Sequence, residues 1–268
     1  MILTDRFVLL NYPRTGSTFV REALSAIYGQ SGSRLRQNLR RLLPVRGKFQ
    51  ELLLPINRTA SALNAGRKSQ HGCYSQIPAS HRGKPVLCVT RNPLERLASK
   101  YTHGFWRDHP PGDLLELKKL LPAFPRLSFE DYLEMEQSAA YEDVRQGASI
   151  QADVGACTLH FIRFFYPDPD VALARLTDES IDSGEFLRGM PEIHFLHTES
   201  LVPELRAFLH SAGFEQELTA FLEDKPPVNC SPSSGEGTRR EYFTPQHAEQ
   251  YRQSNRLLFQ MFPEYDEW

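Results

Sequence analysis

Hydroxyl residues and an arginine stand where an apolar run gives way to a helical pattern near the start of the chain. The apolar run 7–12 is followed by the segment Arg14-Thr15-Gly16-Ser17-Thr18-Phe19. A backbone that turns from a strand into a helix through small residues points several N–H groups at one spot, and the helix N-terminus adds partial positive charge there. Arg14 adds a fixed cation. The segment therefore predicts a site for a phosphate or a sulfate.

A nucleoside triphosphate is the first anionic ligand to consider for such a turn. The Walker loop that binds it reads G-x-x-x-x-G-K-[ST], with the lysine on the β- and γ-phosphates and the next hydroxyl on Mg²⁺. Here Asn11 and Tyr12 fall where the first glycine belongs, and no lysine follows Gly16. The sequence therefore lacks the lysine and the magnesium ligand of phosphoryl transfer, which argues against a kinase. A P-loop-type kinase of nucleotides or small molecules is kept as the alternative hypothesis.

A second strand-to-helix junction follows the apolar run 85–90. Arg91 ends this run, Pro93 suits the first turn of a helix, and Ser99 lies about two helical turns further on. Two anion sites on two such junctions fit a nucleotide with two separate phosphates better than they fit ATP.

Together these motifs resemble the sulfotransferase family that uses 3′-phosphoadenosine-5′-phosphosulfate (PAPS). The segment from Arg14 to Thr18 is similar to the loop that holds the 5′-phosphosulfate, and Arg91 with Ser99 is similar to the pair that grips the 3′-phosphate. The arginine at position 14 and the helix start at 242–245 resemble bacterial or carbohydrate-type members. The resemblance implies transfer of a sulfuryl group from PAPS to a hydroxyl of a small molecule, lipid or carbohydrate, without a metal, releasing adenosine 3′,5′-bisphosphate. A non-catalytic nucleotide-binding module is a third hypothesis.

The base that takes the proton of the acceptor hydroxyl is expected to be His71. In cytosolic sulfotransferases a histidine precedes an apolar-proline pair by the spacing seen here between His71 and 77–78. Histidine suits this work because its ordinary pKa lies near neutrality. His103 is the main rival and Glu22 a weaker one. The family often has a lysine two residues before the histidine; Ser69 stands there in this chain, which leaves charge stabilisation at the sulfuryl group mainly to Arg14.

The resemblance extends towards the C-terminus with less specific motifs. The stretch 193–209 resembles a late strand, an acidic turn and a helix of the family. In the family a basic, glycine-containing loop closes over the 3′-phosphate, and the arginines at 239 and 240 could do so here. The residues expected to contact the nucleotide are Arg14, Thr15, Gly16, Ser17, Thr18, Phe19, Arg91, Ser99, Arg239 and Arg240.

Global properties limit the range of partners. The 268 residues have a net charge of −2 and a pI near 6.5, which argues against bulk nucleic-acid binding. We expect free thiols in a reducing compartment, because the four cysteines have neither C-x-x-C nor metal-ligand spacing. The sequence shows neither a signal peptide nor a membrane span, which favours a cytoplasmic protein.

Periodicity predicts an α/β fold with a mainly parallel central sheet flanked by helices, as in the P-loop-like sulfotransferase fold. Because the motifs for one site lie at both ends of the chain, we expect a single domain over 1–268. A basic run over 34–48 predicts an amphipathic surface helix or, as the alternative, a basic lip that attracts an anionic acceptor or the cofactor. Strands are expected near 7–12, 85–90 and 193–197, and helices near 17–28, 93–106, 113–121, 128–138, 154–165, 199–212 and 244–261. The carboxyl ends of the strands would then carry both Arg14 and Arg91.

Overall fold

A computed structural model describes residues 1–29, 48–55, 68–110, 113–145, 150–228 and 242–266, and the side chains of all of these except 139–145. The strands are β1 (Ile2–Thr4), β2 (Val8–Leu10), β3 (Phe49–Glu51), β4 (Leu54–Pro55), β5 (Lys68–Ser69), β6 (Val86–Thr90) and β7 (His194–His197). The expected basic helix over 34–48 lies almost wholly outside the described residues.

Five strands form one sheet in the order β3-β1-β2-β6-β7, and β4 pairs with β5 in a separate ribbon. The strands β2, β6 and β7 are parallel neighbours, as the sequence predicted for their runs. The expectation of a mainly parallel sheet is corrected at the other edge, since β1 runs antiparallel to both β2 and β3. The sheet is therefore mixed.

The antiparallel edge results from a tight hairpin that sequence periodicity did not reveal. The backbone N–H of Thr4 donates to Phe7 O at 3.0 Å, and the Thr4 hydroxyl donates to the same carbonyl at 2.7 Å. The N–H of Phe7 in turn donates to the Thr4 hydroxyl at 2.8 Å. A connection this short can only reverse the chain, whereas a parallel pairing needs a crossover.

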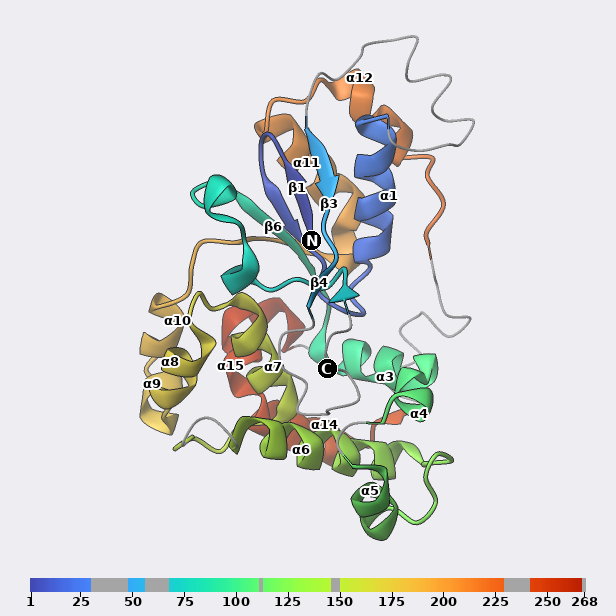
Figure 1. The fold of residues 1–268 in the computed structure, drawn as a ribbon, viewed down its shortest axis with the longest axis vertical. Helices are drawn as coiled ribbons and strands as arrows, with labels where there is room; N and C mark the ends of the chain where they lie inside the picture. The colour runs from blue at the N-terminus through green and yellow to red at the C-terminus, as the bar shows by residue number, and fades with distance from the viewer. Residues whose placement is uncertain (30–47, 56–67, 111–112, 146–149, 229–241, 267–268) are drawn as a thin grey trace.

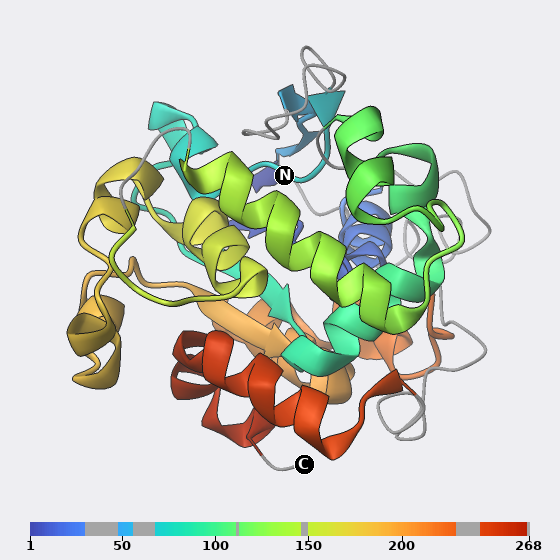
Figure 2. The same cartoon turned by 90° about the horizontal axis from the view of Figure 1, so that it is seen from below.

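Side chains of the central strands alternate between two cores, one on each face of the sheet. Leu9, Leu87 and Val89 pack with α1 (Ser17–Ile27) and α11 (Leu201–Ser211). Val8 and Cys88 face the second core, which is formed with α3 (Pro93–His103), α6 (Phe129–Arg145), α7 (Ala156–Phe165), α14 (Pro245–Ser254) and α15 (Arg256–Met261). Figure 1 shows α1, α11 and α12 (Gln216–Thr219) around the upper part of the sheet and the second group of helices gathered below it. Figure 2 shows that second group, α6, α7, α14 and α15, from below.

Most predicted helices are present, with breaks at two of them. The helix expected over 93–106 ends in left-handed Gly104 and resumes as a separate turn, and the helix expected over 244–261 is interrupted at Asn255. The remaining bounds are α4 (Phe105–Asp108), α5 (Leu114–Leu120), α8 (Pro169–Ala174), α9 (Asp178–Asp182) and α10 (Glu185–Arg188).

Short 3-10 turns complete the described chain, namely η2 (Tyr74–Gln76), η3 (Ala79–His81), η4 (Thr198–Ser200), η5 (Ala220–Leu222) and η6 (Pro263–Tyr265). The described residues form a single compact α/β body. Within them, every helix is too short or too polar to cross a bilayer.

Candidate functional site

The β2–α1 junction takes a backbone path that leaves the start of α1 open. Arg14 has φ 66° and Gly16 has φ 82°, so both lie in the left-handed region. Gly16 occupies the N-cap position, where it offers no side chain to the first turn of α1, and that turn holds no acidic residue. The free N–H groups and the helix dipole therefore favour an anion at this end of α1.

Two residues of the loop hold its shape. Thr15 is fully buried, and its hydroxyl donates to Tyr12 O at 2.8 Å. Phe19, in the first turn of α1, packs its side chain in the core, and its N–H donates to Gly16 O at 3.0 Å. Thr18, by contrast, is partly exposed. The hydroxyl of Thr15 thus stabilises the loop, and Thr18 is the hydroxyl that a ligand could reach.

The β6–α3 junction satisfies its own helix. The side chain of Asn92 caps α3 by accepting from the N–H of Leu94 at 3.0 Å, and Pro93 fills the first position. Arg91 Nη2 lies 2.8 Å from Glu95 Oε2, and both side chains are largely buried. This junction carries a cation, but a carboxylate one turn along α3 already pairs with it.

Arg14 reaches across from the first junction to the second. Its Nε and Nη2 donate to Ser99 Oγ at 3.2 and 2.8 Å. Burial lowers the pKa of Arg14, and the nearby charge of Arg91 lowers it further. Within the described part of the chain, Arg14 has no carboxylate partner. Arg14 beside the open helix end therefore favours a negatively charged ligand there, whereas the charge of Arg91 is already paired with Glu95.

The pairing of Ser99 differs from the one expected from the sequence. We expected Ser99 to act with Arg91, but it is hydrogen-bonded to Arg14. Eight residues along a helix span about 12 Å, so Ser99 lies far from Arg91 along the axis of α3. Arg14 of the β2–α1 loop, in contrast, contacts Ser99 directly. The two predicted phosphate sites therefore share Arg14.

Thr198 links the two junctions, and the sequence analysis did not assign it a role. Its hydroxyl lies 2.8 Å from Thr15 O and 2.7 Å from Thr90 O, so it can donate to either carbonyl. Its methyl group lies 3.6 Å from the position that a Cβ on Gly16 would occupy. The end of β7 thus fixes the spacing between the two loops.

His71 lies against the same loop. Its Nδ1 is 2.7 Å from Asn11 O, and its backbone N–H donates to the hydroxyl of Ser69 at 3.1 Å. A carbonyl only accepts, so Nδ1 carries the proton and Nε2 presents a lone pair. Burial lowers the pKa of His71, and the positive charges of Arg21 and Arg96 also lower it. His71 is therefore a neutral proton acceptor near pH 7.

The two rival bases are placed differently. His103 is exposed on the last turn of α3, and partial desolvation together with the charge of Arg14 lowers its pKa. Glu22 is exposed on α1 and pairs with Lys225 Nζ at 2.8 Å. Of the three, His71 has its tautomer fixed by the loop that carries Arg14.

A buried arginine supports the loop from behind. Arg96 is 3% exposed and donates from Nε to Pro13 O at 3.0 Å. Its guanidinium lies 3.9 Å from the centre of the Tyr12 ring, and it also donates to Cys157 Sγ at 3.1 Å and to His160 Nδ1 at 3.0 Å. Sequence reasoning missed this contact network. The available signal was a charged residue among the apolar positions of α3, one turn before Ser99.

The predicted contacts of Arg239 and Arg240 lie outside the described residues. Cysteines 73, 88 and 157 form no disulfide bond. Within the described part of the chain, no three His, Cys, Asp or Glu side chains are arranged to hold a metal ion.

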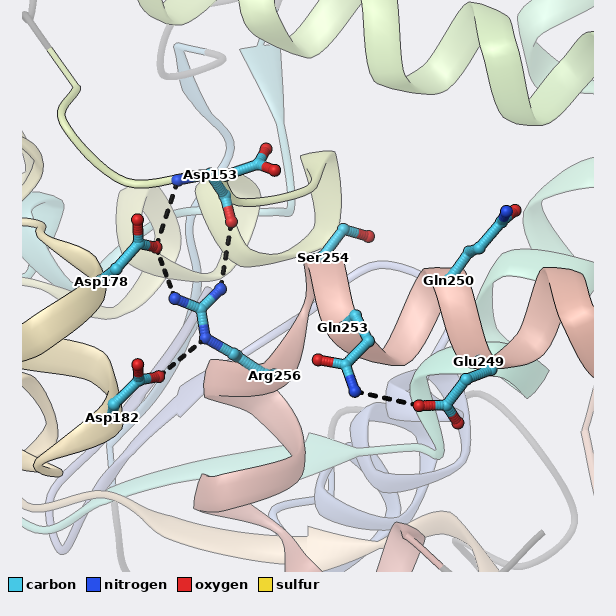
Figure 3. Close-up of a pocket in the computed structure, with 8 residues that line it drawn as sticks. All are labelled: Asp153, Asp178, Asp182, Glu249, Gln250, Gln253, Ser254 and Arg256. Atoms are coloured by element: carbon cyan, nitrogen blue, oxygen red, sulfur yellow. Dashed lines mark hydrogen bonds and ion pairs between the residues drawn. The ribbon is translucent and has the colours of Figure 1, made fainter.

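A separate recess lies between α9, α14 and α15 (Figure 3). Its central cation, Arg256, donates to Asp182 at 2.9 Å, to Asp178 and to the carbonyl of Asp153 at 3.1 Å. Gln253 donates to Glu249 at 3.0 Å along one wall. The two carboxylates already neutralise Arg256, so the network fastens α9 to α15 and attracts no further anion.

Comparisons with protein-family models, with curated proteins and with solved structures gave no match to this chain. Its function must therefore be argued from the site itself.

Proposed function

We propose that the chain is a PAPS-dependent sulfotransferase that moves a sulfuryl group to the hydroxyl of an acceptor and releases adenosine 3′,5′-bisphosphate. One observation carries the proposal: Arg14, beside the open end of α1, is hydrogen-bonded to Ser99 and lies near enough to Arg91 of the neighbouring strand-to-helix junction for the two charges to interact. Two such cations favour a ligand with more than one phosphate. The P-loop-like sulfotransferase fold and the single-domain organisation belong to the same proposal.

Each residue has a role in the reaction. His71 Nε2 takes the proton of the acceptor hydroxyl while the oxygen of that hydroxyl forms a bond to sulfur. The bond between sulfur and the 5′-phosphate oxygen breaks, and its electron pair stays on the phosphate. Arg14 and the N–H groups at the start of α1 stabilise that charge. Sulfuryl transfer resembles phosphoryl transfer, so positioning and electrostatics supply most of the rate.

Nucleotide binding tests the proposal and separates it from a kinase. Calorimetry should show that adenosine 3′,5′-bisphosphate binds without Mg²⁺ and that adenosine 5′-phosphate binds much more weakly. Stabilisation by Mg-ATP alone would favour the kinase. The Arg14→Ala variant should lose far more in kcat than in nucleotide affinity, and Arg107→Ala, an exposed arginine on α4, is the matched control. Equal affinity for both adenosine nucleotides would refute the proposal.

A further inference from the structure

Thr198, directly after β7, makes a contact across the sheet that the pairing of strands does not provide. In the sheet order β6 lies between β2 and β7, so the β2–α1 loop and the end of β7 belong to strands that are not neighbours. The Thr198 hydroxyl nevertheless lies 2.8 Å from Thr15 O, in the β2–α1 loop. The same hydroxyl lies 2.7 Å from Thr90 O, at the end of β6. One side chain therefore connects the segments at the carboxyl ends of all three parallel strands.

The two carbonyls that accept from this hydroxyl are next to the residues that form the two junctions. Thr15 directly precedes Gly16, the N-cap residue of the open helix α1, and Thr90 directly precedes Arg91. Because both carbonyl oxygens are within hydrogen-bond distance of the Thr198 oxygen, they lie within two hydrogen-bond lengths of each other. A hydroxyl has one proton, so it donates to one carbonyl or shares the proton between both. The start of α1 and Arg91 are thus each one residue away from the same contact.

The turn that carries Thr198 is itself held on both sides. The backbone N–H of His197 donates to Glu204 Oε2 at 2.6 Å, and the hydroxyl of Ser200 donates to the other oxygen of the same carboxylate. His197 is also the register partner of Thr90 in the β6–β7 ladder. The Thr198 hydroxyl therefore contacts the two loops from a position that the sheet and α11 hold in place.

A fixed separation between the junctions matters for the nucleotide of the proposed reaction. There the start of α1 with Arg14 binds the 5′-phosphate, and Arg91 contributes to binding of the 3′-phosphate. A ligand that contacts both must carry its phosphates at a matching separation. A misplacement of about 1 Å can cost about 10²-fold in rate. The site would then select the positions of the phosphates on the ribose as well as their number.

We infer that Thr198 is a positioning residue that sets the separation of the two phosphate subsites and thereby selects 3′,5′-bisphosphates over isomers with a different spacing. In this role it acts through Thr15 O and Thr90 O and not through the nucleotide. The inference rests on the proposed sulfotransferase function and adds a determinant of its nucleotide specificity.

Two isomeric nucleotides test the inference. Adenosine 3′,5′-bisphosphate and adenosine 2′,5′-bisphosphate carry the same number of phosphates and differ in their separation. Calorimetry should show that the wild type prefers the 3′,5′ isomer by about tenfold or more. In Thr198→Val, which keeps the shape of the side chain but lacks the hydroxyl, the preference should fall by about three- to tenfold, as for one lost hydrogen bond. Thr198→Ser keeps the hydroxyl and should keep most of the preference.

A second background and a matched control isolate the effect on spacing. In Arg91→Ala, adding Thr198→Val should change the affinity for the 3′,5′ isomer by less than about twofold, because only one subsite is then left to position. Thr219→Val is the control. The buried hydroxyl of Thr219 donates to Gln216 O at 3.0 Å within α12, and its loss should leave the preference unchanged. Thermal unfolding shows which variants are folded.

The outcomes separate this inference from the proposed function. If neither bisphosphate binds to the wild type, the sulfotransferase proposal itself fails. If the 3′,5′ isomer binds, the inference about Thr198 alone is overturned by a wild type without preference, or by a folded Thr198→Val variant that keeps the full preference or weakens both isomers equally. It is also overturned if Thr198→Ser loses as much of the preference as Thr198→Val.

Discussion

The β2–α1 and β6–α3 junctions follow neighbouring parallel strands, yet they differ in how the start of the next helix is capped. At α3, Asn92 caps the helix and Glu95 pairs with Arg91, so the junction is satisfied without a ligand. At α1, Gly16 offers no cap and Arg14 leaves the loop to reach Ser99. The β6–α3 junction is therefore satisfied by its own side chains, whereas the β2–α1 junction leaves the start of α1 uncapped and, among the described residues, Arg14 without a carboxylate partner.

The comparison assigns different work to the two junctions. The open β2–α1 junction holds His71 through Asn11 O, and in the proposed reaction its Arg14 stabilises the charge that develops on the leaving phosphate, so changes there should reduce the rate. The closed junction supplies a cation that must be shared with Glu95, so changes there should alter affinity or stability. The predictions below test this division.

The largest effect is expected for His71→Ala. Loss of the general base should lower kcat by about 10²–10⁴-fold, while affinity for adenosine 3′,5′-bisphosphate stays nearly unchanged because His71 touches the acceptor side. Single-turnover kinetics and calorimetry measure the two quantities. His103→Ala is the matched control and should be mild. Full turnover in the His71 variant would show that another residue is the base.

The next largest effect is expected for Arg91→Ala. Removing the cation from the closed junction should weaken binding of adenosine 3′,5′-bisphosphate by roughly 2–4 kcal/mol if the ion pair is well desolvated. Because this variant also removes an ion pair of Glu95, the double variant Arg91→Ala/Glu95→Ala controls for the loss of that pair. A loss in kcat larger than the loss in affinity would contradict the division between the junctions.

The pH profile should follow the protonation of His71. The reaction needs the neutral ring, and burial lowers the pKa of His71 below 6.5. The kcat should therefore be flat around pH 7 and above and fall on acidification, approaching about tenfold per pH unit once His71 is mostly protonated. Rates measured from pH 5 to 8 test this. An acidic limb with its midpoint above pH 7 is the outcome that rejects His71.

The fold and the site were predictable from the sequence to different degrees. The segments that form β2 and β6 were predicted as strands because both are buried on both faces and are therefore continuous apolar stretches of sequence. The antiparallel strands β1 and β3 are three residues long, and β3, at the edge of the sheet, is largely exposed, so neither gives a periodic signal.

For the site, local motifs revealed Arg14 and Arg91 because both follow apolar strand runs. The contact of His160 with Tyr12 could not be predicted from the sequence around His160. This histidine lies in an amphipathic helix whose pattern explains only packing, and its partner Tyr12 is 148 residues away in the chain. Thr198 was missed for the same reason, since its two acceptors lie on loops that only the folded sheet brings together.

A smaller effect should appear in Asn92→Ala. Loss of the helix cap should lower the free energy of unfolding by about 1 kcal/mol, and the rate of transfer should change little. Urea unfolding and steady-state kinetics provide the two measurements. A variant as stable as the wild type would mean that α3 does not depend on its cap and that the contrast with α1 is not energetic.

The smallest expected effect is a gain. Glu95→Gln releases Arg91 from an i,i+4 ion pair and should tighten binding of adenosine 3′,5′-bisphosphate by about two- to fivefold. Calorimetry at low salt resolves a change of this size. Glu116→Gln, which alters an exposed ion pair with Lys119 on α5, serves as the control and should change nothing. Weaker binding in Glu95→Gln would indicate that Glu95 orients Arg91 for its ligand.

The left-handed backbone of Arg14 has a consequence for the history of this sequence. An L-residue pays roughly 1–2 kcal/mol to hold that conformation, and a glycine would not. Selection for stability alone would thus favour glycine at position 14 and would erase the cation that the site needs. Persistence of arginine there would record selection for activity against stability, so a screen that scores only thermal resistance would lead this chain away from its chemistry.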